Sequence, residues 1–176
     1  MTAEAPPPYL AGLRLAGRRV VVVGAGRVLA RRLGTLLDSG ARLVVVSPQA
    51  APPVRAVARA ARLTWHERDY RLGDLAGAWY ALACTDDPQV NAAVVAEAEA
   101  ARIFCVRADD GSLGTAVTPA SARDGQVQLA VLAGGDFRAS RHLRDRLAAQ
   151  LTAAGQPAAA TLRPGTPRPS RSATED

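Results

Sequence analysis

The chain has little of several residue types that mark particular classes of protein. Lysine is absent, so all 22 basic side chains are arginine, and with 16 acidic side chains they give a formal net charge of +6. Aromatic residues make up only 4% of the chain, which disfavours a nucleic-acid surface, because such surfaces interleave aromatic and basic side chains. No apolar run reaches about 18 residues, so we expect no membrane span and no membrane partner.

Cysteine and histidine are scarce as well. The two cysteines, Cys84 and Cys105, stand in apolar segments typical of strands, and we interpret them as buried free thiols, with a disulfide or a metal pair as the less favoured alternative. His66 and His142 do not stand at metal-ligand spacing, so the sequence predicts no fixed metal site. The start of the chain lacks the basic and apolar stretches of a secretory signal, which favours a cytoplasmic protein.

Strand-like and helix-like patterns alternate over the first two thirds of the chain. Apolar runs predict buried strands at 19–24, 42–46, 63–68, 79–84 and 103–107. Helical spacing predicts helices at 29–37, 53–61 and 89–101. This alternation favours an α/β fold with a Rossmann-like parallel sheet and right-handed crossovers.

The pattern changes after residue 112, where we place a domain boundary. Segments 115–118 and 127–132 flank Asp124-Gly125 and predict a hairpin with a loop longer than two residues. An arginine-rich helix is predicted over 138–153, ending at Gly155. The sequence thus predicts three parts: a Rossmann-like domain, a small α+β segment, and a disordered tail rich in proline, alanine and serine, which span 1–112, 113–154 and 155–176 respectively.

A glycine turn follows the first predicted strand. Gly24, Ala25 and Gly26 stand between that strand and a helix, which is the context of a dinucleotide-binding turn. The first glycine permits the tight turn, and the second lets the backbone approach a diphosphate. The amide groups at the start of the helix, near Arg27 and Val28, would face the anion. We therefore predict a nucleotide site at Gly24 to Val28, with a ligand-free glycine turn as the alternative.

Other positions of the dinucleotide fingerprint differ from the ideal. The third glycine position holds Leu29, so we expect looser packing between helix and strand. The second strand ends in Ser47-Pro48 instead of an acidic residue; the Ser47 hydroxyl can still bond a ribose hydroxyl. No arginine stands directly there to bind a 2′-phosphate, which favours NAD over NADP.

Two acidic pairs follow the fourth and fifth predicted strands. Asp86 and Asp87 come after Thr85; we predict that one aspartate caps the next helix and that Thr85 lies near the cofactor. Asp109 and Asp110 end the fifth strand. Taken alone, this second pair is more typical of a solvated turn than of a catalytic site, although neighbouring carboxylates can raise one another's pKa.

Six segments in chain order have the sequence character of one known family. They are VVVGAGRVLARR at 21–32, GARLVVVSP at 40–48, LTWHERDYRLGDLAGAW at 63–79, ALACTDDPQVN at 81–91, RIFCVRADD at 102–110 and TPASARDGQVQLAVLAGG at 118–135. The TDDPQVN stretch is the most specific of them. Together they resemble the precorrin-2 dehydrogenase/sirohydrochlorin ferrochelatase family, the N-terminal module of siroheme synthases, over about residues 10–151.

The resemblance implies an NAD-dependent oxidation of precorrin-2 to sirohydrochlorin in siroheme biosynthesis, followed in some members by iron insertion. It places nucleotide contacts on Arg27, Val28, Ser47 and Pro48, and it makes Asp109 the catalytic carboxylate. In the family the segment after the sheet forms the dimer contact. We therefore expect a homodimer, in which the apolar hairpin finds a partner for its edges.

The tetrapyrrole substrate implied by the resemblance carries eight carboxylates, and arginine forks suit carboxylates well. We predict that Arg107, at the end of the fifth strand, and Arg138 and Arg141, on the last helix, bind it; a solvated basic helix is the alternative for the last two. Composition alone also allows nucleic acid or a codon bias as the reason for the arginine excess.

The chain departs from the family pattern at three places. They are Val106, where the family has asparagine; the turn at 134–138, which has lost a serine and a proline; and the segment after the last helix, where the family continues into a helical region. Together with Leu29, the changes at Val106 and at 136–138 leave open a second hypothesis from another class: a non-catalytic Rossmann module that senses NAD(H).

Overall fold

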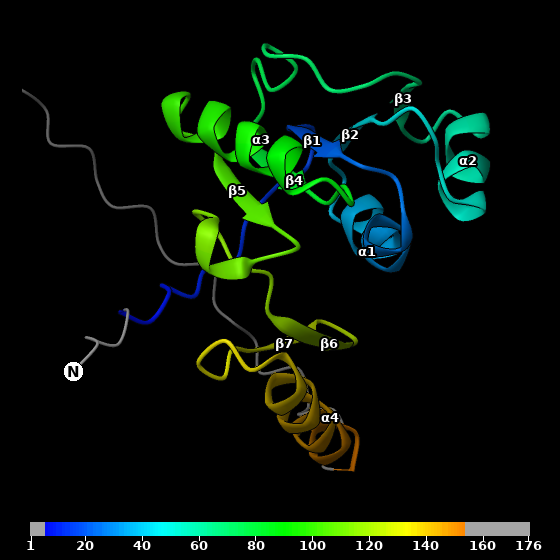
Figure 1. Ribbon diagram of the computed structural model, residues 1–176. Helices are drawn as coiled ribbons and strands as arrows, with labels where there is room; N and C mark the ends of the chain where they lie inside the picture. The colour runs from blue at the N-terminus through cyan, green and yellow to red at the C-terminus, as the bar shows by residue number, and fades with distance from the viewer. Residues whose placement is uncertain (1–5, 154–176) are drawn as a thin grey trace, which may run out of the picture. The chain divides into compact units, whose positions relative to one another are not determined.

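Five parallel strands form the sheet of the first of two structural units (Figure 1). The computed structural model describes residues 6–153, and the units divide after Thr118. The strands are β1 (Arg19–Val23), β2 (Arg42–Val46), β3 (Thr64–His66), β4 (Tyr80–Ala83) and β5 (Phe104–Arg107). Their order is β3-β2-β1-β4-β5, which confirms the predicted Rossmann-like sheet. In this order β1 and β4 flank the switch point, where ligands bind at the carboxyl ends of the strands.

Helices cover both faces of the sheet. Alternate valines of β1 point to opposite faces: Val20 and Val22 pack in the cluster that includes α1 and α2, whereas Val21 and Val23 pack in the cluster that includes α3. These four side chains are at most 1% exposed, and burying each contributes about 1.5–3 kcal/mol. The helices are α1 (Arg27–Asp38), α2 (Pro52–Arg59) and α3 (Pro88–Ala100).

A leucine fills the contact between α1 and the sheet. Leu29, which stands at the third glycine position of the fingerprint, is 0% exposed and belongs to the core that α1 forms with β1 and β2. A fully buried side chain therefore stands where the ideal fingerprint has a glycine, and the looser contact between helix and strand stays a prediction. Helix α1 ends as predicted: Ser39 is its C-cap residue, and Gly40 follows with φ +71°.

The segment 115–118, predicted as the first strand of a hairpin, continues the first unit instead. Ala116 forms a parallel bridge to Val106, and its amide donates to the Cys105 carbonyl at 3.0 Å. The Thr115 hydroxyl accepts from the Cys105 amide at 2.9 Å. These bonds tie the segment to β5, so the hairpin begins later than the sequence pattern suggested, and the first unit extends beyond the boundary predicted after residue 112.

The second unit, described by itself, is a hairpin with one helix. Its elements are β6 (Ala120–Asp124), β7 (Val127–Val131) and α4 (Phe137–Ala153). The strands are joined by Gly125 and Gln126 alone, because Asp124 pairs with Val127. Gly125 has φ +55° at the first turn position, as in the type II′ turns that match the twist of a hairpin. The turn therefore lies where we predicted it, but its loop is shorter than we expected.

Helix α4 packs on its own hairpin through polar contacts. Asp136 accepts the amides of Arg138 and Ala139 at 2.8 and 2.9 Å and so caps the helix. The Arg144 guanidinium donates to the Ser121 carbonyl at 2.7 Å. An aspartate thus caps the helix within the turn that has lost the serine and proline of the family pattern. The predicted helix end at Gly155 and the predicted disordered tail lie outside the described residues.

Both cysteines are buried free thiols in the structure, as predicted. Burial raises the pKa of Cys84 to about 12 and that of Cys105 to about 11. Neither thiol is therefore a nucleophile near neutral pH. Among the described residues no helix is both long and apolar enough to cross a membrane.

Candidate functional site

The turn after β1 is shaped by the backbone that packs against it. Gly24 has φ +99°, and a Cβ atom placed there would lie 2.6–2.8 Å from backbone atoms of Cys84 and Thr85. The Cys84 thiol donates to the Gly24 carbonyl at 3.3 Å. Only glycine fits this position, because both the conformation and the close approach exclude a side chain. The turn after β1 and the turn after β4 are thereby held together at the switch point.

The second glycine meets open space instead. No atom lies within 4 Å of a Cβ built on Gly26, and no side chain caps α1 at its N-terminus. The first amide groups of the helix keep their hydrogen-bonding capacity and the positive end of the helix dipole. Ala25 is buried, Arg27 is exposed and Val28 is half-buried. An open, uncapped helix start behind a tight glycine turn fits a dinucleotide diphosphate.

Every polar atom of Ser47, the residue that follows β2, forms a hydrogen bond within the chain. The Ser47 amide donates to the His66 carbonyl at 3.2 Å, and its carbonyl accepts the indole N–H of Trp65 at 3.0 Å. Its hydroxyl donates to the Gln49 carbonyl at 2.7 Å, so towards a ribose it can act only as an acceptor. Pro48 beside it is exposed.

An arginine lies closer to this loop than the sequence suggested. Arg55, on α2, points back along the helix, and its Nε donates to the Ala50 carbonyl at 2.7 Å. No arginine stands directly after the second strand in the sequence, as we stated. The long side chain of Arg55 nevertheless reaches the loop after β2, because helical side chains point towards the N-terminus of their helix.

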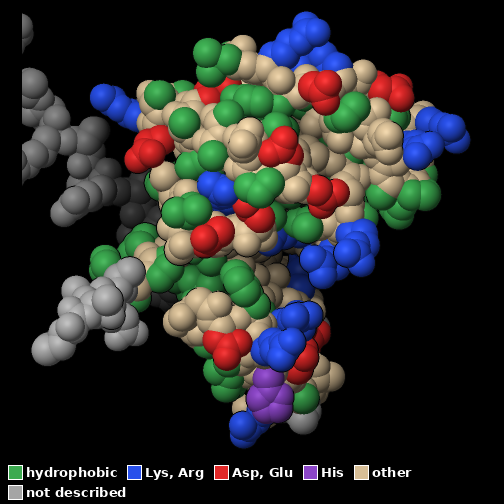
Figure 2. All heavy atoms as spheres, viewed as in Figure 1, with side chains coloured by type: hydrophobic (Ala, Val, Ile, Leu, Met, Phe, Trp, Pro, Cys, Tyr) green, Lys and Arg blue, Asp and Glu red, His purple; other side chains and the backbone are tan. Residues whose placement is uncertain are grey.

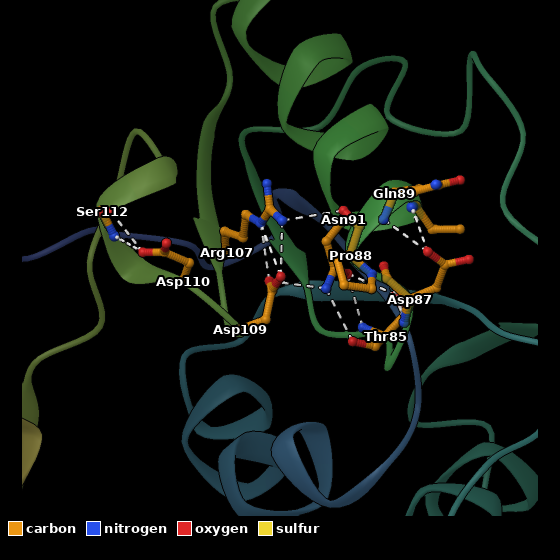
Figure 3. A network of polar contacts seen from close by, with 10 residues as sticks. Thr85, Asp87, Pro88, Gln89, Asn91, Arg107, Asp109, Asp110 and Ser112 are labelled. Atoms are coloured by element: carbon orange, nitrogen blue, oxygen red, sulfur yellow. Dashed lines mark hydrogen bonds and ion pairs between the residues drawn. The ribbon is translucent and has the colours of Figure 1, made fainter.

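Asp109 is the centre of a polar network at the carboxyl ends of β4 and β5 (Figure 3). Nε and Nη2 of Arg107 donate to its two carboxylate oxygens at 3.0 and 2.9 Å, which makes a forked ion pair. Nδ2 of Asn91, on α3, donates to Oδ1 at 3.0 Å. The Arg107 side chain is only 10% exposed and that of Asp109 30%. The Arg107 hydrogen bonds, with smaller help from Asn91, hold the pKa of Asp109 below its ordinary value.

Asn91 is the residue of this network that our sequence reasoning missed. It is 0% exposed, and its amide group also donates to the Thr85 carbonyl at 3.0 Å and accepts the Thr85 amide at 3.0 Å. The Thr85 hydroxyl lies 2.8 Å from the same Asn91 oxygen. One buried side chain therefore fixes both the turn after β4 and the carboxylate after β5. Its signal was the last residue of the TDDPQVN stretch, where we had interpreted only the threonine and the aspartates.

The neighbouring aspartates have local structural partners. Asp87 accepts the Gln89 amide at 2.8 Å and caps α3, which confirms that part of our prediction. Asp110 points away from Asp109 in Figure 3 and bonds Ser112, in a single 3₁₀ turn. Its bonds to Ser112 lower the pKa of Asp110. Asp109 does raise the pKa of Asp110, as expected of a neighbouring carboxylate, but the bonds from Ser112 outweigh this effect and the net shift is downward.

The remaining predicted arginines lie in the second unit. Arg138 and Arg141 are exposed on α4, and Arg141 makes a long bond of 3.4 Å to the Phe137 carbonyl. Arg107 is the predicted substrate arginine that belongs to the network around Asp109. Within residues 6–153 the structure has no group of three histidine, cysteine or acidic side chains arranged to hold a metal ion.

More than half of the chain matches known proteins. A family model described as "Putative NAD(P)-binding" matches residues 11–120. The chain belongs to this family. Siroheme synthase 1 of Aeromonas salmonicida (strain A449) is 35% identical over 139 residues, which cover 78% of this chain and 30% of the relative. The siroheme synthase of Pseudomonas putida (strain W619) is 37% identical over 123 residues, covering 70% and 26%.

A solved structure shares the fold. SirC, precorrin-2 dehydrogenase, matches with a TM-score of 0.69 at 24% sequence identity, over 81% of this chain and 71% of that chain. The resemblance drawn from six sequence segments is thus confirmed, and the glycine turn lies within the part that the family model matches. The chain spans about 30% of the length of the first of these siroheme synthases.

Proposed function

We propose that this chain catalyses the NAD-dependent oxidation of precorrin-2 to sirohydrochlorin in siroheme biosynthesis. The observation that carries the proposal is the Asp109 carboxylate, fixed by Arg107 and Asn91 at the sheet edge that also bears the glycine turn. The comparisons support the proposal in two ways. Proteins named siroheme synthase match most of this chain, and SirC shares its fold.

The oxidation removes a hydride from the tetrapyrrole and releases a proton. NAD⁺, when bound, supplies the hydride acceptor. Positive charge develops on the macrocycle as the hydride leaves, and a preorganised carboxylate stabilises such charge in a partly desolvated site. Because Arg107 keeps the pKa of Asp109 low, Asp109 is a weak proton acceptor. In this proposal it orients and stabilises the macrocycle, and the proton is released to water.

The cofactor contacts are proposed from the geometry of the turn. The amide groups after Gly26 would bind the diphosphate, the Ser47 hydroxyl would accept a bond from a ribose hydroxyl, and Thr85 would lie beside the nicotinamide half. Parallel titrations with NAD⁺ and NADP⁺ test the expected preference for NAD⁺. The preference reverses if Arg55 binds a 2′-phosphate.

The proposed reaction is tested by incubating the protein with enzymatically prepared precorrin-2 and NAD⁺ and following the absorption of sirohydrochlorin. Turnover that depends on both compounds supports the proposal. Tight binding of NAD⁺ without turnover would favour the NAD(H)-sensing module instead. Addition of ferrous iron to the product then tests for iron insertion.

The pH profile of the reaction provides a test of the ion pair. The pKa of Asp109 lies below the ordinary carboxyl value of 3.8. Asp109 therefore stays ionised above pH 3.8, and its negative charge is lost only as the pH falls through the lowered pKa. We therefore expect no acid limb from Asp109 in kcat/KM between about pH 5 and 8. Arg107→Gln removes the largest cause of the shift, so the acid limb of Asp109, which lies below about pH 5, should move upward towards its ordinary pKa when the profiles are extended to about pH 3. An Arg107→Gln profile that overlays the wild type would contradict the assignment.

We also propose that the protein is a homodimer assembled through the second unit. In its described part, Ser140 is the only fully buried residue, and the apolar side chains of Val127, Phe137, Leu143 and Leu147 are 38–56% exposed. Figure 2 shows apolar side chains open to solvent among charged ones on one face of the molecule. A hairpin and helix without a buried apolar core gain stability by pairing with a second copy.

Light scattering at micromolar concentration should give the mass of two chains. Leu143→Glu combined with Leu147→Glu should shift the protein to monomer, because both side chains lie on one side of α4, one turn apart. Leu72→Glu, at an 84% exposed position of the first unit, is the matched control and should leave the dimer intact. A wild type that is monomeric throughout would remove this proposal.

A cytoplasmic location and tetrapyrrole contacts at Arg138 and Arg141 remain predictions.

A further inference from the structure

Arg32, on α1, is a charged side chain that the proposed site does not use. Its Nη1 atom is buried and has no hydrogen-bond partner among the described residues. Arg32 also takes part in none of the ion pairs found within residues 6–153. Its neighbour Arg31 is exposed on the same helix. A guanidinium that is buried without an acceptor is costly, because its solvation is lost and not replaced.

The surroundings of Arg32 offer it hydroxyl and thiol groups but no acid. The titratable groups that affect the pKa of Arg32 are Tyr80, at the start of β4, Cys84, just after its end, and Arg31. Burial lowers the pKa of Arg32, which is the signature of a cation without a close carboxylate. The Thr118 hydroxyl, near Tyr80, is also buried without a geometrically sound hydrogen bond. Two groups from different segments therefore have unused hydrogen-bonding capacity around Tyr80.

An exposed aromatic side chain borders this cluster. Phe104 pairs in register with Tyr80 across β4 and β5, so the two side chains lie next to each other on the same face of the sheet. Phe104 is 58% exposed. Arg32 and Thr118 offer hydrogen-bond donors without an acceptor, and Phe104 offers an exposed apolar ring beside them. This combination suits a flat, apolar molecule that carries anionic substituents.

We propose that Arg32, with the Tyr80 and Thr118 hydroxyls, forms a binding site for a carboxylate of a small flat ligand. Resting on the function proposed above, that ligand is the tetrapyrrole, one of whose side-chain carboxylates Arg32 binds. The carboxylate would complete the hydrogen bonding of Nη1 and neutralise the buried charge. This assigns a substrate contact to a residue six positions after Gly26, on the helix that follows the glycine turn.

The test uses uroporphyrin, a stable tetrapyrrole octacarboxylate, as the probe in a fluorescence titration of the full chain. Arg32→Met should weaken its binding about 10- to 100-fold, because a charge-assisted hydrogen bond to a desolvated group is lost. Arg31→Met makes the same change of charge at the neighbouring exposed position and should alter binding by less than about twofold. NAD⁺ affinity, read from the same preparations, should be unchanged in both variants.

Thermal unfolding separates a binding role from a structural one. If Arg32 awaits a ligand, Arg32→Met removes an uncompensated buried charge and should melt no lower than Arg31→Met. A lower melting temperature specific to Arg32→Met would overturn the proposal, and so would wild-type affinity for uroporphyrin. Dissociation of a dimer by Arg32→Met with unchanged porphyrin binding would also overturn it, since the anion would then come from a second copy.

The failure of this inference differs from the failure of the proposed function. If the wild type does not oxidise precorrin-2 yet binds uroporphyrin through Arg32, the carboxylate site stands and the dehydrogenase proposal falls. If oxidation proceeds with an unchanged KM in Arg32→Met, the reverse holds.

Discussion

Asp109→Asn is expected to lower kcat for precorrin-2 oxidation by about 10²- to 10⁴-fold, the range found when a positioned catalytic group or charge is removed. The asparagine oxygen can still accept from Nε of Arg107 and from Asn91, whereas its NH2 group cannot accept from Nη2 of Arg107, so the network loses its negative charge and one arm of the fork. NAD⁺ affinity should stay within about twofold, because the diphosphate contacts proposed at the glycine turn are untouched. Steady-state kinetics with sirohydrochlorin absorption, together with NAD⁺ titration, measure both quantities.

Asp110→Asn is the matched control for this change. It removes the same charge one residue later, where the carboxylate bonds Ser112 in an exposed 3₁₀ turn. We expect turnover within a few-fold of the wild type. Equal losses in the two variants would point to net charge rather than to the fixed position of Asp109. A fully active Asp109→Asn enzyme would remove Asp109 from the mechanism.

The sheet could be predicted from the sequence because its strands are dense in valine and its connections are short. The β1 run RVVVV, buried on both faces, has few other structures open to it. The hairpin was misplaced because residues 115–118 also suit an extended segment. Whether they pair with β7 or bridge β5 is decided by the Thr115 hydroxyl and the Cys105 backbone, which lie ten residues apart.

The site was predicted in its parts but not in its connections. The glycine turn and Asp109 follow from strand ends, which all point to one edge of a parallel sheet. The contacts between Asn91, Thr85 and Asp109 require the relative rotation of α3 and β5, which no local pattern contains. Arg107 was expected to meet substrate carboxylates, yet within the chain it binds Asp109, because the two side chains leave the strand on the same side two residues apart.

Substitution of the two glycines separates folding from cofactor binding. Gly24→Ala should destabilise the protein by about 3–5 kcal/mol, since the new Cβ would meet the Cys84 and Thr85 backbone in a left-handed conformation. Gly26→Ala adds the same methyl group where the chain has no atom within 4 Å. It should therefore fold normally but lose NAD⁺ binding by about 100-fold or more, because the methyl group would occupy the place of the diphosphate.

Urea unfolding and NAD⁺ titration of both variants decide the matter, with Gly34→Ala on α1 as a control. Gly34 also has open space around its Cβ position but lies two turns further along the helix. An alanine there should bind NAD⁺ normally and be slightly stabilised, by up to about 1 kcal/mol. Normal NAD⁺ binding by Gly26→Ala would mean that the cofactor does not approach this turn. The carboxylates and arginines proposed to act beside it would then lose the cofactor on which their roles depend.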